Sequence, residues 1–234
     1  MKKDFKVICF DADDTLWLNE TYYREGEKAF YRLLSDYGSP NLLAKELLKT
    51  EIQNINLYGF GAKSFMLSMI ETAISISNSN ISQEVIDGII KLGKDLINKP
   101  IVLLDGVQEI LERLYSSGQK MIMATKGDLL DQERKLANSS LEKYFHHIEI
   151  MSDKKEDNYI KLLSHLDIKA TDFLMIGNSM KSDIIPVVNI GGYGVYVPCK
   201  DQWEYEKAGN IEGLENYWKI NQISELCEIL ELGK

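Results

Sequence analysis

The sequence predicts an α/β fold: an open, parallel sheet with helices on both faces, joined to an all-helical domain. Two patterns predict it. Short apolar runs alternate with helical patterns over most of the chain, which is typical of parallel sheets. After the first run, residues 19–99 instead carry apolar side chains at helical spacing with no strand between them. The chain, at 234 residues, is long enough for a core domain that carries a smaller inserted one.

The core elements follow in order along the chain. Residues 6–10 form a nearly continuous apolar run, as expected of a strand that is buried on both faces of a sheet. Four later segments have the same form, and a short edge strand is predicted near the end. The predicted strands are 6–10, 120–124, 147–151, 173–176, 194–197 and 216–220. The predicted helices of the core are 106–117, 129–139, 156–166, 182–189 and a closing helix over 222–232.

Residues 19–99 predict four helices, over 20–37, 40–55, 62–77 and 82–97. Pro40 follows Ser39 at a favoured first helical position, and Ser82 is a typical N-cap. The sequence therefore predicts a catalytic core of residues 1–18 and 100–234 and a helical domain of residues 19–99. Residues 98–100 are the expected return linker.

Composition narrows the classes of partner. The formal net charge of -9 argues against nucleic acid, because that affinity comes from clustered Lys and Arg. Three widely spaced cysteines show no zinc-ligand spacing. The first residues lack the apolar run of a signal peptide, and no stretch reaches the roughly 18 apolar residues of a membrane span. We therefore expect a cytoplasmic protein with no nucleic-acid or membrane partner.

Each predicted core strand ends in polar residues. Ligands of open α/β sheets bind at the carboxyl ends of the strands, so one pocket can collect these side chains. The polar groups are Asp11-Ala12-Asp13-Asp14-Thr15, Thr125-Lys126-Gly127-Asp128, Ser152-Asp153-Lys154-Lys155 and Gly177-Asn178-Ser179 with the later Asp183.

Carboxylates two positions apart at a strand end require a cation or a proton, because buried ionised acids are costly otherwise. Mg²⁺ prefers oxygen ligands, and the side chains of Asp11 and Asp183 with the backbone carbonyl of Asp13 would supply them. An Asp11 oxygen then remains to attack phosphorus and form an aspartyl phosphate. Asp13 can protonate the leaving oxygen and then activate water. The hydroxyl of Thr125 and the ammonium of Lys154 would bind the phosphoryl oxygens.

The blocks FDADDTL, MATKG, SDKK and MIGNSMKSD occur in this order. They resemble the four motifs of the haloacid dehalogenase superfamily, and the helical insert resembles its helical cap. The resemblance implies a Rossmann-like core, magnesium, an aspartyl-enzyme intermediate and, most often, phosphatase activity on small metabolites. It places the nucleophile at Asp11, the acid/base at Asp13, the phosphate-binding threonine at Thr125 and a metal ligand at Asp183.

Three positions depart from the family pattern or leave a choice open. Asn178 stands where many relatives have a second acid, so a metal bound there meets one negative charge fewer. Lys126 replaces the commoner small polar residue, and is either a substrate contact or a solvated turn residue. The phosphate-binding lysine is Lys154 or Lys155, and the following helix pattern favours Lys154.

We expect a magnesium-dependent phosphatase that acts on a small phosphorylated metabolite. A dehalogenase would not need an acid at Asp13. A phosphomutase of the same superfamily remains an alternative, as does a noncatalytic phosphate-binding or signalling module, although such receiver modules are shorter and lack the insert. The sequence identifies neither the natural substrate nor the oligomeric state.

Overall fold

The computed structural model describes residues 4–207 and 213–230. The chain divides into two compact units. The core unit comprises residues 1–18, 101–126 and 132–234, and the helical unit comprises residues 19–100 and 127–131. This division differs from the predicted one at residue 100 and at residues 127–131, which fall in the helical unit.

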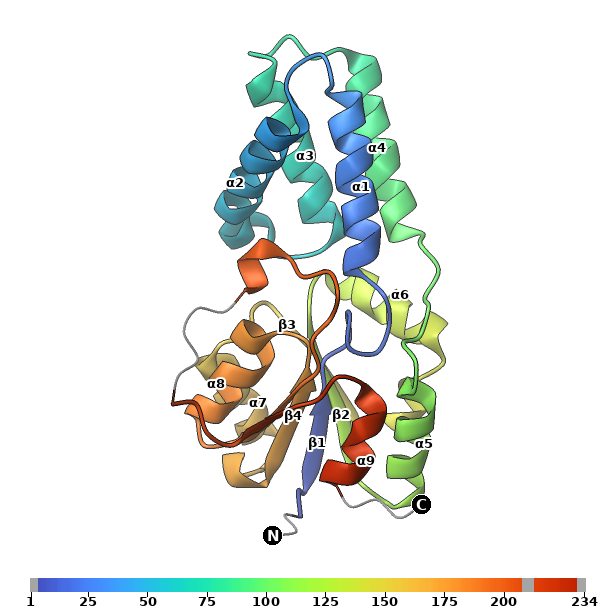
Figure 1. Cartoon of the computed structure of the whole chain (residues 1–234), viewed down its shortest axis with the longest axis vertical. Coiled ribbons are helices and arrows are strands. Elements are labelled where there is room, and N and C mark those ends of the chain that lie inside the picture. The colour runs from blue at the N-terminus through green and yellow to red at the C-terminus, as the bar shows by residue number, and fades with distance from the viewer. Residues whose placement is uncertain (1–3, 208–212, 231–234) are drawn as a thin grey trace. The chain divides into compact units, whose positions relative to one another are not determined.

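The core unit contains a parallel six-stranded sheet (Figure 1), so the predicted fold class is confirmed. The strand order is β3-β2-β1-β4-β5-β6. The strands are β1 (Val7–Phe10), β2 (Met121–Lys126), β3 (His147–Met151), β4 (Phe173–Gly177), β5 (Tyr193–Tyr196) and β6 (Tyr217–Lys219). β1 lies in the middle, with β2 on one side and β4 on the other.

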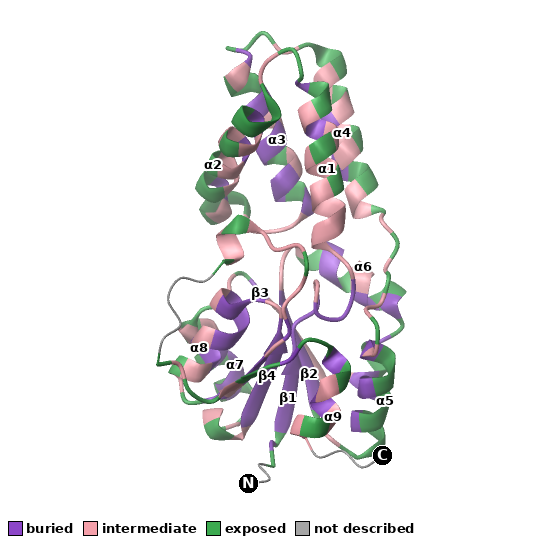
Figure 2. Cartoon of the chain, in the orientation of Figure 1, coloured by how far each residue is buried: buried purple, intermediate pink, exposed green. Residues whose placement is uncertain are grey.

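Helices cover both faces of this sheet, and each face has its own apolar core (Figure 2). Alternate side chains of β1 point to opposite faces of the sheet. Ile8 and Phe10 pack in one core, and Val7 and Cys9 pack in the other. The first core receives α5 (Val107–Ser116), α6 (Leu129–Ser139) and α9 (Leu226–Ile229). The second receives α7 (Glu156–His165) and α8 (Ile185–Asn189).

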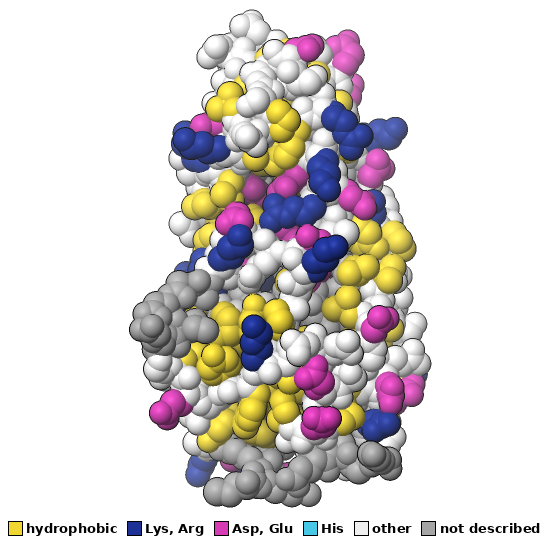
Figure 3. All heavy atoms as spheres, viewed as in Figure 1, with side chains coloured by type: hydrophobic (Ala, Val, Ile, Leu, Met, Phe, Trp, Pro, Cys, Tyr) yellow, Lys and Arg dark blue, Asp and Glu magenta, His cyan; other side chains and the backbone are white. Residues whose placement is uncertain are grey.

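The helical unit contains four helices that enclose a third apolar core. These are α1 (Glu20–Leu33), α2 (Pro40–Tyr58), α3 (Ala62–Ile76) and α4 (Gln83–Ile97). α3 packs against α2 and α4, and α4 packs against α1. On the face drawn in Figure 3, the acidic and basic side chains of these helices are interspersed.

Most predicted elements differ from the observed ones only at their ends. Ser39 and Ser82 cap α2 and α4, since their side chains accept hydrogen bonds from Leu42 and Val85 backbone amides. Of the predicted helix over 182–189, only α8 (Ile185–Asn189) is α-helical, and residues 182–184 belong to a wide helical turn, Met180–Ile184. The predicted closing helix is short, and its residues 231–232 lie outside the described part of the chain.

None of the helices within residues 4–207 and 213–230 has the length and apolar character of a membrane span. All three cysteines lie among the described residues and none forms a disulfide; Cys9 is buried.

Candidate active site

The sheet register brings the predicted motifs to one edge. Phe10 of β1 pairs with Met123 of β2 and with Ile176 of β4. Asp11, Thr125 and Gly177 follow these residues directly or after one position. Because the strands are parallel, their polar ends lie at the same edge of the core unit.

Asp11, Lys154 and Asp183 form a buried cluster of charges. The Lys154 ammonium donates to Asp11 Oδ1 at 2.5 Å and to Asp183 Oδ1 at 2.8 Å. The side chains of Lys154 and Asp183 are each 1% exposed, and that of Asp11 is 9% exposed. A cation that lies between two buried carboxylates removes most of their repulsion. Lys155 instead pairs with Asp153, with 70% of its side chain exposed, so the structure places Lys154 rather than Lys155 in the site.

Burial governs the protonation equilibria of this cluster. It raises the pKa of Asp11 to about 7, against the opposing attraction of the Lys154 ammonium. Burial also lowers the pKa of Lys154, but the two carboxylates outweigh it and hold that pKa well above its ordinary value. The lysine therefore stays charged at neutral pH.

Asp11 Oδ2, the backbone carbonyl of Asp13 and the side chain of Asn178 meet on the other side of Asp11. When the side-chain amide of Asn178 is oriented with its nitrogen toward them, that nitrogen donates to Asp11 Oδ2 at 3.1 Å and to the Asp13 carbonyl at 3.2 Å. With its oxygen there instead, the Asn178 side chain brings that oxygen to these distances from the other two. Adjacent ligands of octahedral Mg²⁺ lie about 3 Å apart, given Mg–O distances of about 2.0–2.1 Å. The residues therefore fit the ion.

Thr15 supports the same group of oxygens. Its hydroxyl donates to Asp11 Oδ2 at 2.9 Å and accepts from the Asn178 backbone amide at 3.1 Å. Within the described ranges, no three His, Cys, Asp or Glu side chains gather as a metal-binding group. Asp183 instead accepts from Lys154 and from the Ser179 backbone amide at 2.9 Å. Its predicted role as a metal ligand remains a prediction.

The Asp13 side chain accepts hydrogen bonds from three residues that the sequence did not single out. Trp17 Nε1 donates to Oδ1 at 2.7 Å, and Gln132 Nε2 donates to Oδ2 at 3.0 Å. The Lys135 ammonium lies 2.9 Å and 3.1 Å from the two oxygens. Gln132 and Lys135 lie three residues apart on α6, a spacing that puts both on one helix face. That spacing was the only sequence signal available for them.

Thr125 and Lys126 end β2 beside one another but meet different partners. Thr125 is buried, and its hydroxyl accepts from Gln132 Nε2 at 2.8 Å. The Lys126 ammonium pairs with Glu206 and donates to Ser182 Oγ at 2.9 Å. The side chains of Lys126 and Glu206 are largely shielded, at 15% and 13% exposed, and whether Lys126 contacts the substrate remains a prediction.

Glu206 was also absent from the predicted site. Its carboxylate accepts from Ser179 Oγ and Ser182 Oγ, each at 2.6 Å, as well as from Lys126. Burial raises the pKa of Glu206, but Lys126 and the two hydroxyls outweigh it and hold that pKa below its usual value. This one carboxylate joins the end of β2 to the turn that carries Asp183.

A protein-family model for haloacid dehalogenase-like hydrolases matches residues 5–191 of the chain. A search of curated proteins found no relative of significant similarity.

Solved structures give the same family. A haloacid dehalogenase-like hydrolase from Xanthomonas campestris is 34% identical, with a TM-score of 0.86, and the match covers 97% of this chain and 91% of that one. The HAD-hydrolase YfnB from Bacillus subtilis, bound to magnesium, is 17% identical with a TM-score of 0.66, covering 98% and 100%. A 2-haloacid dehalogenase from Pseudomonas syringae is 16% identical with a TM-score of 0.64, covering 97% and 98%. The last two likenesses concern the fold. Further matches are described as phosphatases.

Proposed function

The chain belongs to the haloacid dehalogenase-like hydrolases, and from that premise we propose that it is a magnesium-dependent phosphatase acting on a small phosphorylated metabolite. The observation that carries the proposal is the pair Asp11 and Asp13. Asp11 is buried against Lys154, and Asp13 presents a second carboxylate two residues later, bound to donors on α6. A dehalogenase needs no second acid, because no leaving oxygen takes up a proton.

The first step transfers the phosphoryl group to Asp11. An Asp11 carboxylate oxygen attacks phosphorus, and the bond between phosphorus and the ester oxygen breaks. Asp13 gives its proton to that oxygen, so the product leaves as an alcohol. Lys154 lies within hydrogen-bond reach of Asp11 Oδ1, where its charge offsets the negative charge that gathers during transfer.

The second step restores the enzyme. Asp13, now ionised, takes a proton from a water molecule, and the water oxygen attacks phosphorus. The bond between phosphorus and Asp11 breaks, which releases inorganic phosphate and leaves Asp13 protonated for the next cycle. Trp17 and Lys135 hold the ionised form of Asp13 in place.

Asp11, the carbonyl of Asp13 and Asn178 would hold Mg²⁺, with Asp183 as a further predicted ligand. The ion would neutralise charge on the phosphoryl oxygens. Thr125, Lys126 and Lys154 are the proposed phosphate-binding residues. We also propose that the protein is cytoplasmic and that it binds neither nucleic acid nor a membrane.

The test is hydrolysis of a panel of phosphorylated metabolites with and without magnesium, with one 2-haloacid in the same panel. Wild type is expected to release phosphate only with magnesium and to release no halide. Asp11→Asn is expected to lose turnover completely while keeping its fold, because the amide nitrogen is no nucleophile. Asp157→Asn, an exposed change on α7, is the matched control and should keep wild-type rates.

Two results would contradict the proposal. Halide release without phosphate release would make the protein a dehalogenase. Phosphate release by Asp11→Asn equal to that of wild type would exclude the covalent mechanism.

A further inference from the structure

Gln132 connects the two predicted chemical groups that come from different strands. Its side-chain amide nitrogen lies 3.0 Å from Asp13 Oδ2, 2.8 Å from Thr125 Oγ1 and 3.0 Å from the Lys126 carbonyl, so its two hydrogens are shared among three acceptors. Asp13 follows β1 and Thr125 belongs to β2. One amide on α6 therefore sets the separation of the acid/base carboxylate and the phosphate-binding hydroxyl.

The orientation of this amide is fixed by its surroundings. Turning it over would place the oxygen against the Asp13 carboxylate and the Lys126 carbonyl, both of which are acceptors. In the observed orientation, the oxygen of Gln132 is buried and accepts no hydrogen bond from the described residues. A buried acceptor without a donor is unfavourable, and such an exception calls for an explanation in function or bound solvent.

Packing does not account for a glutamine here. Leu136, also on α6, already anchors the helix in the apolar core of the sheet. An apolar side chain at position 132 would fill the same space without an unpaired oxygen. What an apolar side chain lacks is the pair of donor hydrogens.

Lys135 adds a charge to the same carboxylate. Its ammonium contacts both oxygens of Asp13, and its side chain is 14% exposed against 22% for Asp13. Since Trp17 is only four residues from Asp13, it fixes the carboxylate locally. Gln132 and Lys135 fix it from another element and thus relative to β2.

We propose that Gln132 and Lys135 are positioning residues that aim the Asp13 carboxylate at the phosphoryl group bound beside Thr125. The inference rests on the proposed function. Lys135 contacts both oxygens of Asp13, whereas Gln132 contacts Asp13 and also Thr125. The two residues should therefore affect proton transfer and phosphate binding differently.

The experiment measures kcat and KM separately with the best substrate of the panel. Lys135→Met is expected to lower kcat by about 10- to 100-fold with KM within about twofold, because the acid/base group loses a supporting cation while Gln132 still holds Thr125. Gln132→Met is expected to lower kcat similarly and also to raise KM several-fold. Lys135→Arg should recover most of the lost kcat, since it restores a cation beside Asp13.

The controls separate positioning from folding. Lys161→Met on α7 and Gln108→Met on α5 make the same changes at exposed positions and should leave both constants unchanged. If Gln132→Met does not fold, Gln132→Asn withdraws the amide by one methylene and keeps the residue polar. Thermal melting of each variant checks that the rate losses occur in folded protein.

The outcomes are distinguishable. Wild-type turnover together with an unchanged kcat in Lys135→Met overturns the inference and leaves the proposed function standing. Equal losses in Lys135→Met and Lys135→Arg, or equal KM values in the Gln132 and Lys135 variants, also overturn it. A wild type without phosphatase turnover contradicts the proposed function, and the inference falls with it.

Discussion

Gly177 ends β4 where the carboxylate of Asp183 packs against the backbone. A Cβ at this position would lie 2.3 Å from Asp183 Oδ2 and 2.4 Å from its carboxyl carbon, far inside contact distance. Gly177→Ala would push Asp183 off Lys154 and the Ser179 amide. We expect kcat/KM to fall by about 100-fold, as displacements of about 1 Å do in active sites, measured beside the melting temperature.

Gly26→Ala is the matched control. A Cβ there would meet Phe65 at 3.5 Å, an ordinary contact, and Gly26 lies within α1. Alanine in a helix interior is favoured over glycine by about 0.5–1 kcal/mol, so this variant should melt higher with unchanged kcat. A Gly177→Ala protein with wild-type kinetics would show that Asp183 has no part in the reaction.

The sequence could predict site residues that end strands, because strand ends are visible as the end of an apolar run. Asp11, Thr125 and Lys154 are of this kind, and the structure brings them to one edge of the sheet. Gln132, Lys135 and Glu206 could not be found in this way. Their role depends on which helix face or loop meets the strand ends, and that is set by tertiary packing rather than by local spacing.

Helices α1 and α2 show what limits the prediction of element ends. α2 continues to Tyr58, beyond the predicted residue 55, and stops at Gly59, whose φ of 71° suits a helix-ending glycine. α1 ends at Leu33 instead of residue 37, because residues 34–37 close a turn in which the Tyr37 amide donates to the Leu34 carbonyl. The apolar spacing persists through that turn, so the pattern alone does not reveal the end.

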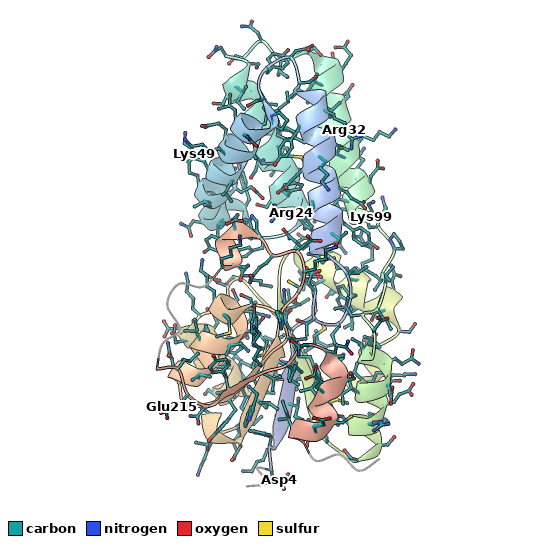
Figure 4. All side chains as sticks on the ribbon, in the orientation of Figure 1. Asp4, Arg24, Arg32, Lys49, Lys99 and Glu215 are labelled. Atoms are coloured by element: carbon teal, nitrogen blue, oxygen red, sulfur yellow. The ribbon has the colours of Figure 1, made fainter. Side chains whose placement is uncertain are left out.

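A charged cluster on α1 and α2 leads us to predict that stability depends on pH. Arg24 (Figure 4) pairs with Glu20 and Glu27. Burial and the charge of Glu27 together raise the pKa of Glu51 to about 8, against the opposing charge of Arg24. Over the pH range between the two pKa values, Glu51 thus stays protonated in the folded protein but is ionised in the unfolded chain. Stability is then lost as pH rises from about 4.5 to about 8.

Glu51→Gln removes this loss. The variant should match wild type near pH 4 and exceed its free energy of unfolding by roughly 2–4 kcal/mol above pH 8, as measured by urea denaturation across pH. Glu46→Gln, on the same helix and paired at the surface with Lys49, should show no such pH trend. An equal difference at all pH values would mean that Glu51 is ionised in the folded state.

The molecule as a whole carries a formal charge of -9, and its net negative charge favours a bound cation. Folding brings the Asp11 carboxylate, the Asp13 carbonyl and the Asn178 side chain together at the edge of the core unit. An ion that binds only this folded arrangement stabilises the whole unit. Magnesium should therefore be detectable through unfolding, without any substrate.

At about 100 times its dissociation constant, magnesium should raise the free energy of unfolding by about 2.7 kcal/mol. That corresponds to about 2–4 °C per kcal/mol in a chain of this size. Asn178→Asp adds a charged oxygen to the ligands. Without magnesium, this variant should melt at a lower temperature than wild type, because the new carboxylate faces Asp11. Its melting temperature should reach half of the magnesium-induced shift at about a tenfold lower magnesium concentration.

The measurement is thermal melting over a magnesium series, with sodium chloride at matched ionic strength as the baseline. Asn138→Asp introduces the same charge at an exposed position of α6. It should reach half of its magnesium-induced shift at the wild-type magnesium concentration, since the new charge lies on the surface and is screened by salt. Equal midpoints for Asn178→Asp and Asn138→Asp would mean that the ion does not touch position 178. Because the readout is unfolding, it tests the metal site even where the natural substrate is unknown.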